Sequence, residues 1–157
     1  MIRILILLAS HGAALGLGFA LGIYLLPILT APPSPEASVL EEKARAAVFT
    51  GTFTRDLEGS DFAHWGEGTI SLTPTEIIHE GTLAPGPDYK LYLLKDFVET
   101  EEAFLALKDQ AVRIGDVKSF DGFVVRVPDG VSVADYRAVV IWCEAFSEFI
   151  TAASYQH

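Results

Sequence analysis

The chain has 157 residues, a formal net charge of −10 and a single cysteine. This length predicts one folded domain with accessory segments. The acidic balance repels phosphate backbones and so excludes nucleic-acid binding as an expected function. One cysteine excludes a framework of disulfides within the chain.

The N-terminal segment, residues 4–31, contains no charged side chain. It exceeds the roughly 20 apolar residues that cross a bilayer core, so we predict a transmembrane signal-anchor over residues 1–31. A cleaved signal peptide is the alternative, but its apolar region usually runs only about 7–15 residues. Pro32 also follows the small residue Ala31, where a cleavable bond would otherwise be placed.

The charges around this segment predict its orientation. Arg3 is the only charged residue before the span, so the positive-inside bias places the N-terminus in the cytoplasm. We therefore expect a single-pass protein of the cytoplasmic (inner) membrane whose C-terminal domain is periplasmic or otherwise extracytoplasmic. Because Arg3 contributes one positive charge, the rest of the chain carries about −11.

Three small residues, Ala14, Gly18 and Gly22, recur every four positions within the span. This spacing puts them on one helix face and lets two helix backbones approach closely, which favours self-association. The alternative is that small residues are simply common in membrane helices.

Residues 32–47 are predicted to form a Pro-rich spacer and a short helix. The helix is expected over residues 35–47, with Ser34 as N-cap and Pro35 at its first position. Glu41 and Arg45 have the spacing of a helical ion pair. We expect this segment to hold the domain off the membrane.

From residue 48 onward, runs rich in Val, Ile, Thr and aromatic residues alternate with Gly, Pro and Asp turns. Residues 99–110 break this pattern and predict one short helix. The fold class expected for residues 48–157 is mainly β, an antiparallel β-sandwich or barrel with one short helix, preceded by the transmembrane helix.

Six short motifs follow one another in this β-rich part. They are GTF at 51–53, H-x-G-x-G at 64–68, GPD at 86–88, IGDVK at 114–118, G-x-x-x-x-VP at 122–128 and VIWC at 140–143.

In this order and spacing the chain resembles the DM13 family over residues 48–155. The resemblance implies a β-rich extracytoplasmic domain associated with electron transfer. It also implies a cysteine that takes part in redox chemistry alone or beside haem-binding partners. Carried over residue by residue, Cys143 takes the redox position with Trp142 beside it, and His64 takes the histidine before the second strand. The other matching positions are Gly86, Pro87 and Asp88 in the turn, Tyr92 in the following strand, and Phe146.

Two interpretations of Cys143 stay open. On a strand it shares a face with Val139 and Ile141, while Trp142 and Glu144 lie on the opposite face, which the carboxylate marks as the more exposed one. Cys143 is then directed toward a core, where a thiol is commonly inert packing. The resemblance favours a redox thiol instead.

A redox thiol needs a group that lowers its pKa, and His64, Lys118 and Arg126 are the candidates for this role. No metal site is predicted, because the only methionine, Met1, lies on the cytoplasmic side and a complete blue-copper ligand set is lacking. A C-x-x-C-H attachment motif is absent, so any haem would be non-covalent or carried by a partner.

The function expected from the sequence is a membrane-anchored redox or electron-transfer accessory centred on Cys143, with another chain as electron partner. The alternative is a non-redox module that binds a ligand or protein and in which the cysteine is core packing. An independent enzyme is not expected, since no nucleophile elbow, zincin helix or paired-carboxylate motif occurs.

Overall fold

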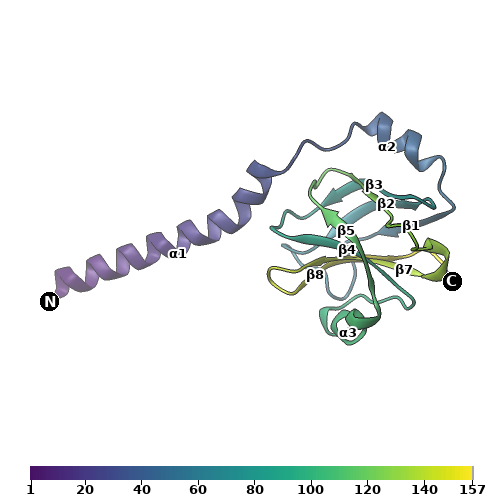
Figure 1. Ribbon diagram of the computed structural model, residues 1–157. Helices are drawn as coiled ribbons and strands as arrows, with labels where there is room; N and C mark the ends of the chain where they lie inside the picture. Colours follow the sequence, from purple (N-terminus) through teal and green to yellow (C-terminus); the bar gives the residue numbers. More distant parts are fainter. Residues whose placement is uncertain (157) are drawn as a thin grey trace.

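The computed structural model describes residues 1–156 and contains one long helix followed by a β-domain (Figure 1). The helices are α1 (Ile2–Thr30), α2 (Ala37–Ala44) and α3 (Glu101–Leu107), with short 3-10 turns η1 (Lys108–Gln110) and η2 (Val133–Asp135). The strands are β1 (Phe49–Phe53), β2 (Gly66–Leu72), β3 (Glu76–Leu83), β4 (Tyr89–Leu94), β5 (Val112–Val117), β6 (Phe123–Arg126), β7 (Ala138–Cys143) and β8 (Glu148–Ser154).

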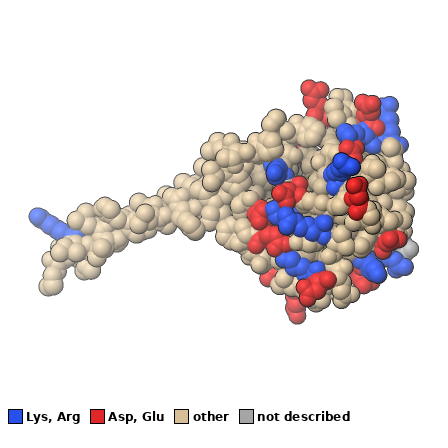
Figure 2. All heavy atoms as spheres, viewed as in Figure 1, with Lys and Arg blue, Asp and Glu red and all other residues tan. Residues whose placement is uncertain are grey.

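Helix α1 projects from the domain as a separate rod (Figure 1). Its 29 residues span roughly 44 Å at 1.5 Å per residue, more than the hydrocarbon core of about 30 Å. None of them is buried, and Figure 2 shows charged side chains on the rod only near its free end. The chain therefore has an N-terminal helix long and apolar enough to span a membrane.

Helix α2 differs from its prediction. It begins at Ala37 with Glu36 in the N-cap position, and Ser34 does not cap it. Glu36 has an extended backbone (φ −61°, ψ 144°), so the helical conformation starts only after it. Leu40 is buried, and a Lys43–Glu76 ion pair at 2.7 Å holds the helix on β3. This helix therefore packs on the sheet and does not act only as a spacer.

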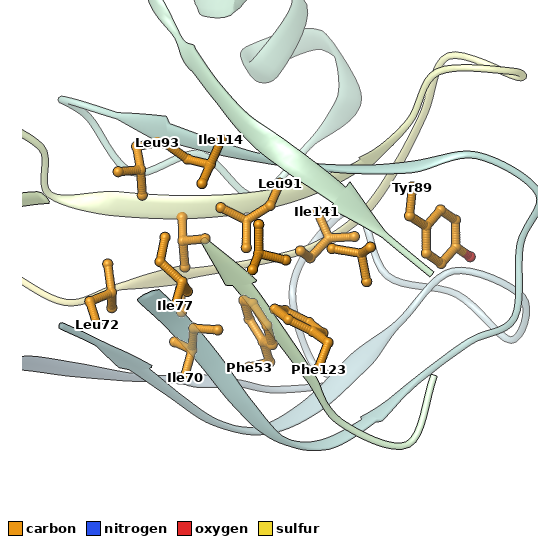
Figure 3. Close-up of a cluster of buried hydrophobic side chains, with 14 of the residues drawn as sticks. Phe53, Ile70, Leu72, Ile77, Tyr89, Leu91, Leu93, Ile114, Phe123 and Ile141 are labelled. Carbon is orange, nitrogen blue, oxygen red and sulfur yellow. The ribbon is translucent and has the colours of Figure 1, made fainter. Parts of the chain in front are cut away.

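The β-domain consists of two four-stranded antiparallel sheets, with strand orders β1-β2-β3-β6 and β5-β4-β7-β8. Side chains from both sheets meet in one hydrophobic core (Figure 3). Alternate residues of β4 and β7 enter it, including Leu91, Leu93, Val139 and Ile141. The prediction of a mainly β, antiparallel sandwich is confirmed.

A second, smaller core lies on the outer face of the sheet that contains β7. Phe104 of α3 packs there against Trp142 at 4.7 Å and against Tyr92 at 5.3 Å between ring centroids. Helix α3 begins where Thr100 Oγ1 accepts a hydrogen bond from Ala103 N at 3.2 Å. The expectation that the Trp142 face is the more exposed one is wrong, because α3 covers it and leaves Trp142 fully buried.

His79 is a buried histidine that the sequence analysis did not single out. It lies on β3 between Phe53 and Phe123, with ring centroids at 5.2 and 5.0 Å. Its Nε2 donates to the carbonyl oxygen of Glu67 at 3.1 Å. Burial lowers the pKa of His79 to about 4, although the hydrogen bond to Glu67 opposes the shift. The ring is therefore neutral at physiological pH.

Acidification below pH 6.5 is expected to destabilise the domain through His79. The unfolded chain protonates this ring near pH 6.5 but the folded chain only near pH 4, so between these values the unfolded state binds more protons. The stability that His79 contributes is complete above pH 6.5 and is lost as the pH falls toward 4, by up to about 3 kcal/mol. Urea unfolding of the full chain in detergent, repeated across this range, measures the slope.

The matched variants for this measurement are His79→Gln and His64→Gln. Gln at position 79 does not titrate, so this variant is expected to lose much of the slope between pH 4 and 6.5. His64→Gln is expected to keep it, because His64 lies in a partly exposed loop. Identical pH dependence in both variants would assign the slope to other groups.

Candidate functional site

Cys143 is the last residue of β7, at the end of the sandwich that faces α1. It pairs with Tyr89 of β4 and with Glu148 of β8. As predicted, it shares the inner face of the sheet with Val139 and Ile141. The thiol is free and only 2% exposed.

A cavity of about 340 Å³ adjoins Cys143. His64, Gly86, Pro87 and Phe146 line it together with the cysteine, so five of the eight predicted site residues meet here. The other seven lining residues were not predicted from the sequence. These are Ile23 and Tyr24 of α1, Ala63, Pro85, Tyr89, Glu148 and Ile150.

Tyr89 lies at the boundary between the core and this cavity. The residue is 3% exposed, and Figure 3 shows its hydroxyl pointing away from the other labelled side chains. That hydroxyl has no hydrogen-bond partner among residues 1–156, and burial raises the pKa of Tyr89 so that it remains protonated. A Cβ on Gly86 would overlap the Tyr89 ring, which gives this glycine of the GPD motif a packing role.

His64 is held in place by Asp61. The Asp61 carboxylate accepts hydrogen bonds from the backbone N–H groups of Ala63 and His64, both at 2.7 Å, and lies 3.1 Å from His64 Nδ1. Partial burial works to raise the pKa of Asp61, but these hydrogen bonds outweigh it and hold that pKa below its usual range. His64 therefore braces its loop and presents one side to the cavity.

The environment of Cys143 favours the neutral thiol. Burial raises the pKa of Cys143, and hydrogen bonds from the backbone at Phe146, Asp88 and Ala145 offset only part of the effect. Neither Lys118 nor Arg126, two of the candidate cations, lines the cavity. The cavity brings only His64 near the thiol.

The surroundings of Cys143 do not fit a haem or metal ion held by a cysteine thiolate. A thiolate ligand requires a deprotonated cysteine, and the cavity has no Lys or Arg to support one. Residues 1–156 contain no group of three or more His, Cys, Asp or Glu side chains placed to hold a metal ion. We therefore derive no chemistry through a bound haem at this site.

Two predicted site residues, Trp142 and Tyr92, lie on the opposite face of the sheet. The Tyr92 hydroxyl donates to Glu144, and Lys108 Nζ donates to the other Glu144 oxygen at 2.7 Å. Burial works to raise the pKa of Glu144, but the bonds from Lys108 and Tyr92 keep it below its usual range. Lys108 also lies 5.1 Å from the centre of the Trp142 ring, so this cluster joins α3 to the sheet.

An aspartate in a turn commonly accepts hydrogen bonds from backbone N–H groups of that turn, but Asp88 has a different partner. Its carboxylate accepts a hydrogen bond from Lys90, whose side chain is 11% exposed and lies 3.1 Å from Asp116. Burial works to lower the pKa of Lys90, but the two carboxylates raise it overall. The Asp88 carbonyl also accepts from Glu144 N at 3.0 Å and joins the turn to the end of β7.

Removal of both the Asp88 and the Asp116 carboxylates is expected to lower the free energy of unfolding by more than the sum of the two single substitutions. Asp88→Ala alone should cost about 1 kcal/mol, because Asp116 still pairs with Lys90. The double variant Asp88→Ala/Asp116→Ala leaves a nearly buried ammonium group without a carboxylate, which costs about 3–5 kcal/mol. Urea unfolding of the wild type, both single variants and the double variant forms the cycle. If the cost of the double variant equals the sum of the two single costs, Asp88 and Asp116 do not share Lys90 as a partner.

Comparison with known proteins identifies one family. A family model described as "Electron transfer DM13" matches residues 39–155. No curated protein and no solved structure matches the chain. The matched range includes every cavity residue outside α1.

Proposed function

Because the chain belongs to the electron transfer DM13 family, we propose that it is a membrane-anchored electron-transfer accessory whose redox-active group is Cys143. The observation that carries this proposal is the shared cavity. Cys143, His64 and the Gly86-Pro87 turn are far apart in the sequence, yet all line one cavity at the end of the domain next to α1. If Cys143 served only as packing, the fold would not require a cavity beside it.

The proposed chemistry is thiol–disulfide exchange with a partner protein. The Cys143 sulfur gives up its proton and attacks one sulfur of the partner's disulfide. That disulfide breaks as the mixed disulfide forms, and the displaced partner sulfur leaves with the bonding electron pair and takes up a proton. Cys143 is thereby oxidised and the displaced sulfur is reduced. A reduced dithiol donor then completes the transfer. Its first thiol attacks the Cys143 sulfur and releases the partner with both sulfurs reduced. Its second thiol attacks the donor sulfur of the new mixed disulfide, which restores the Cys143 thiol and leaves the donor as a disulfide, so two electrons have passed from donor to partner.

The raised pKa of Cys143 makes this exchange slow in the isolated domain. The attacking species is the thiolate, and burial keeps it scarce at neutral pH. The proposal therefore requires that the cavity admit a disulfide without unfolding of the domain.

The experiment is to treat the folded full chain in detergent with a small neutral disulfide, 2,2′-dithiodipyridine, and to record thiopyridone release. Reaction through the cavity is expected to be at least tenfold faster than global unfolding, which is measured separately by dilution into urea. Cys143→Ala is the blank. A wild-type rate equal to the unfolding rate would refute the proposal.

A non-redox binding module is the second candidate, and the burial of the thiol favours it. Cys143 is 2% exposed and belongs to the main core with Val139 and Ile141. In this alternative the cavity binds its ligand or partner by shape, and the cysteine contributes packing alone. A thiol that reacts only after denaturation, together with saturable ligand binding, would support it.

We further propose that α1 remains attached as an anchor and that the β-domain lies on the extracytoplasmic side. The support is the length of α1 and the position of Arg3 at its start. A periplasmic reporter fused after residue 157 is expected to be active, and a cytoplasmic reporter at the same site inactive. The reverse pattern would overturn the orientation, and a mature chain that begins near residue 32 would overturn the anchor.

A further inference from the structure

A second hollow lies between α1 and the turn that joins β7 to β8. It has a volume of about 520 Å³, and its walls include Phe19, Gly22 and Leu26 of α1. It shares Ile23 and Phe146 with the cavity beside Cys143, and also Pro87. The two hollows are therefore neighbours, and we treat them together as a passage from the side of the membrane helix to the thiol.

The membrane anchor places this passage at the outer boundary of the bilayer. About 20 residues span the hydrocarbon core, so a span counted from Ile4 ends near Ile23 and Tyr24. Tyrosine is typical of the interface between lipid and water. Phe146 in the β7–β8 turn is 50% exposed and lines both hollows beside α1. The passage is therefore open to molecules dissolved in the outer leaflet.

The polar groups of the passage select a neutral molecule. No Lys or Arg lines either hollow, while Glu148 contributes a carboxylate, so an anionic head group would be repelled. The Tyr89 hydroxyl is a donor without a protein partner among residues 1–156, and Tyr89 lines the cavity beside Cys143. A ring carbonyl is an acceptor that this hydroxyl could bind.

We propose that the passage binds a membrane-dissolved carrier of the quinone class, an inference that rests on the proposed electron-transfer function. The apolar tail lies along α1 between Gly22 and Phe146. The head ring enters the inner cavity, where one carbonyl oxygen accepts a hydrogen bond from Tyr89 beside Cys143. The volumes of the two hollows, about 340 and 520 Å³, are within the usual range of small-molecule sites.

The test uses the full chain in phosphatidylcholine nanodiscs and a radiolabelled decyl-tailed benzoquinone, with empty nanodiscs to subtract partition into lipid. Saturable binding at one site per chain is expected. Tyr89→Phe removes the donor and should weaken binding about tenfold. Ala63→Phe fills the inner cavity and should abolish it, whereas Ala134→Phe, on an exposed turn, is the matched control and should bind as the wild type does.

Three results would overturn the inference: no saturable binding, unchanged binding in both cavity variants that remain folded by circular dichroism, or equal displacement by a decyl-chain zwitterionic lipid. The last would mean that the passage holds lipid chains. Thiopyridone release from Cys143, recorded on the same samples, separates the two proposals. Loss of quinone binding with a reactive thiol would refute this inference alone. Quinone binding with an inert thiol would refute only the redox role of Cys143.

Discussion

Gly68→Ala is expected to lower the free energy of unfolding of the domain by about 2–6 kcal/mol. Gly68 has a φ of +117°, a backbone conformation that L side chains rarely adopt. An added Cβ would overlap the Glu80 carbonyl oxygen and lie 2.6 Å from the Gly81 Cα, both on the backbone of β3. Strain of about 1–3 kcal/mol and overpacking of about 1–3 kcal/mol together approach the total stability of a small domain.

Gly130→Ala is the matched control for this prediction. Gly130 also has a positive φ, +85°, but no heavy atom lies within 4 Å of the position that its Cβ would take. Its substitution should cost only the backbone term, about 1–2 kcal/mol. Thermal unfolding of both variants in detergent, followed by circular dichroism, measures the difference. If Gly68→Ala is no less stable than Gly130→Ala, the close approach of β2 and β3 is not the reason for this glycine.

The close contacts around Gly66 and Gly68 explain why the H-x-G-x-G motif has glycine at both positions. A Cβ on Gly66 would lie 2.5 Å from a Thr151 methyl group on β8 and 2.8 Å from Leu83, so this glycine allows the two sheets to approach. The motif therefore combines two backbone requirements with His64, which lines the cavity. Nothing in the local sequence shows which strand each of these glycines faces.

The strand pattern predicted the sandwich because alternation along β7 separates Val139 and Ile141 from Trp142. It could not predict that the Trp142 face is covered as well. Glu144 seemed to mark that face as exposed, yet Lys108 pairs with it from η1, just beyond α3. Coverage of a sheet by a helix far along the chain depends on tertiary packing, which no local periodicity reports.

The candidate site was predicted in part. The motifs identified Cys143, His64 and the Gly86-Pro87 turn, because glycine, proline and a lone thiol are distinctive in a β-rich chain. Tyr89 follows the GPD motif directly, but nothing local distinguishes its free hydroxyl from that of Tyr92, which is bonded to Glu144. The contribution of α1 to the cavity depends on how the helix meets the domain, which composition cannot supply.

Cys143→Ala is expected to abolish electron transfer without unfolding the domain. The side chain is small and lies at the end of β7, so loss of the sulfur should cost at most about 1–2 kcal/mol. Cys143→Ser has nearly the same shape but buries a more polar group, at a cost of about 1–3 kcal/mol that the backbone donors at Phe146, Asp88 and Ala145 reduce. The two variants therefore differ in stability while both lack the thiol, which separates chemistry from packing.

The measurement uses host membranes from which the native chain has been removed and to which each variant is restored, with electron flow to an added acceptor dye as the readout. At a temperature where both variants stay folded, a redox thiol predicts that both lose the flow that the wild type restores. A packing thiol predicts that flow follows stability, with Cys143→Ala close to the wild type and Cys143→Ser below it. Burial and the raised pKa of Cys143 point toward packing, whereas the shared cavity points toward chemistry. We expect both variants to lose the electron flow. A passage that leads from the membrane to the buried Cys143 sulfur would have no function if that sulfur served only as packing.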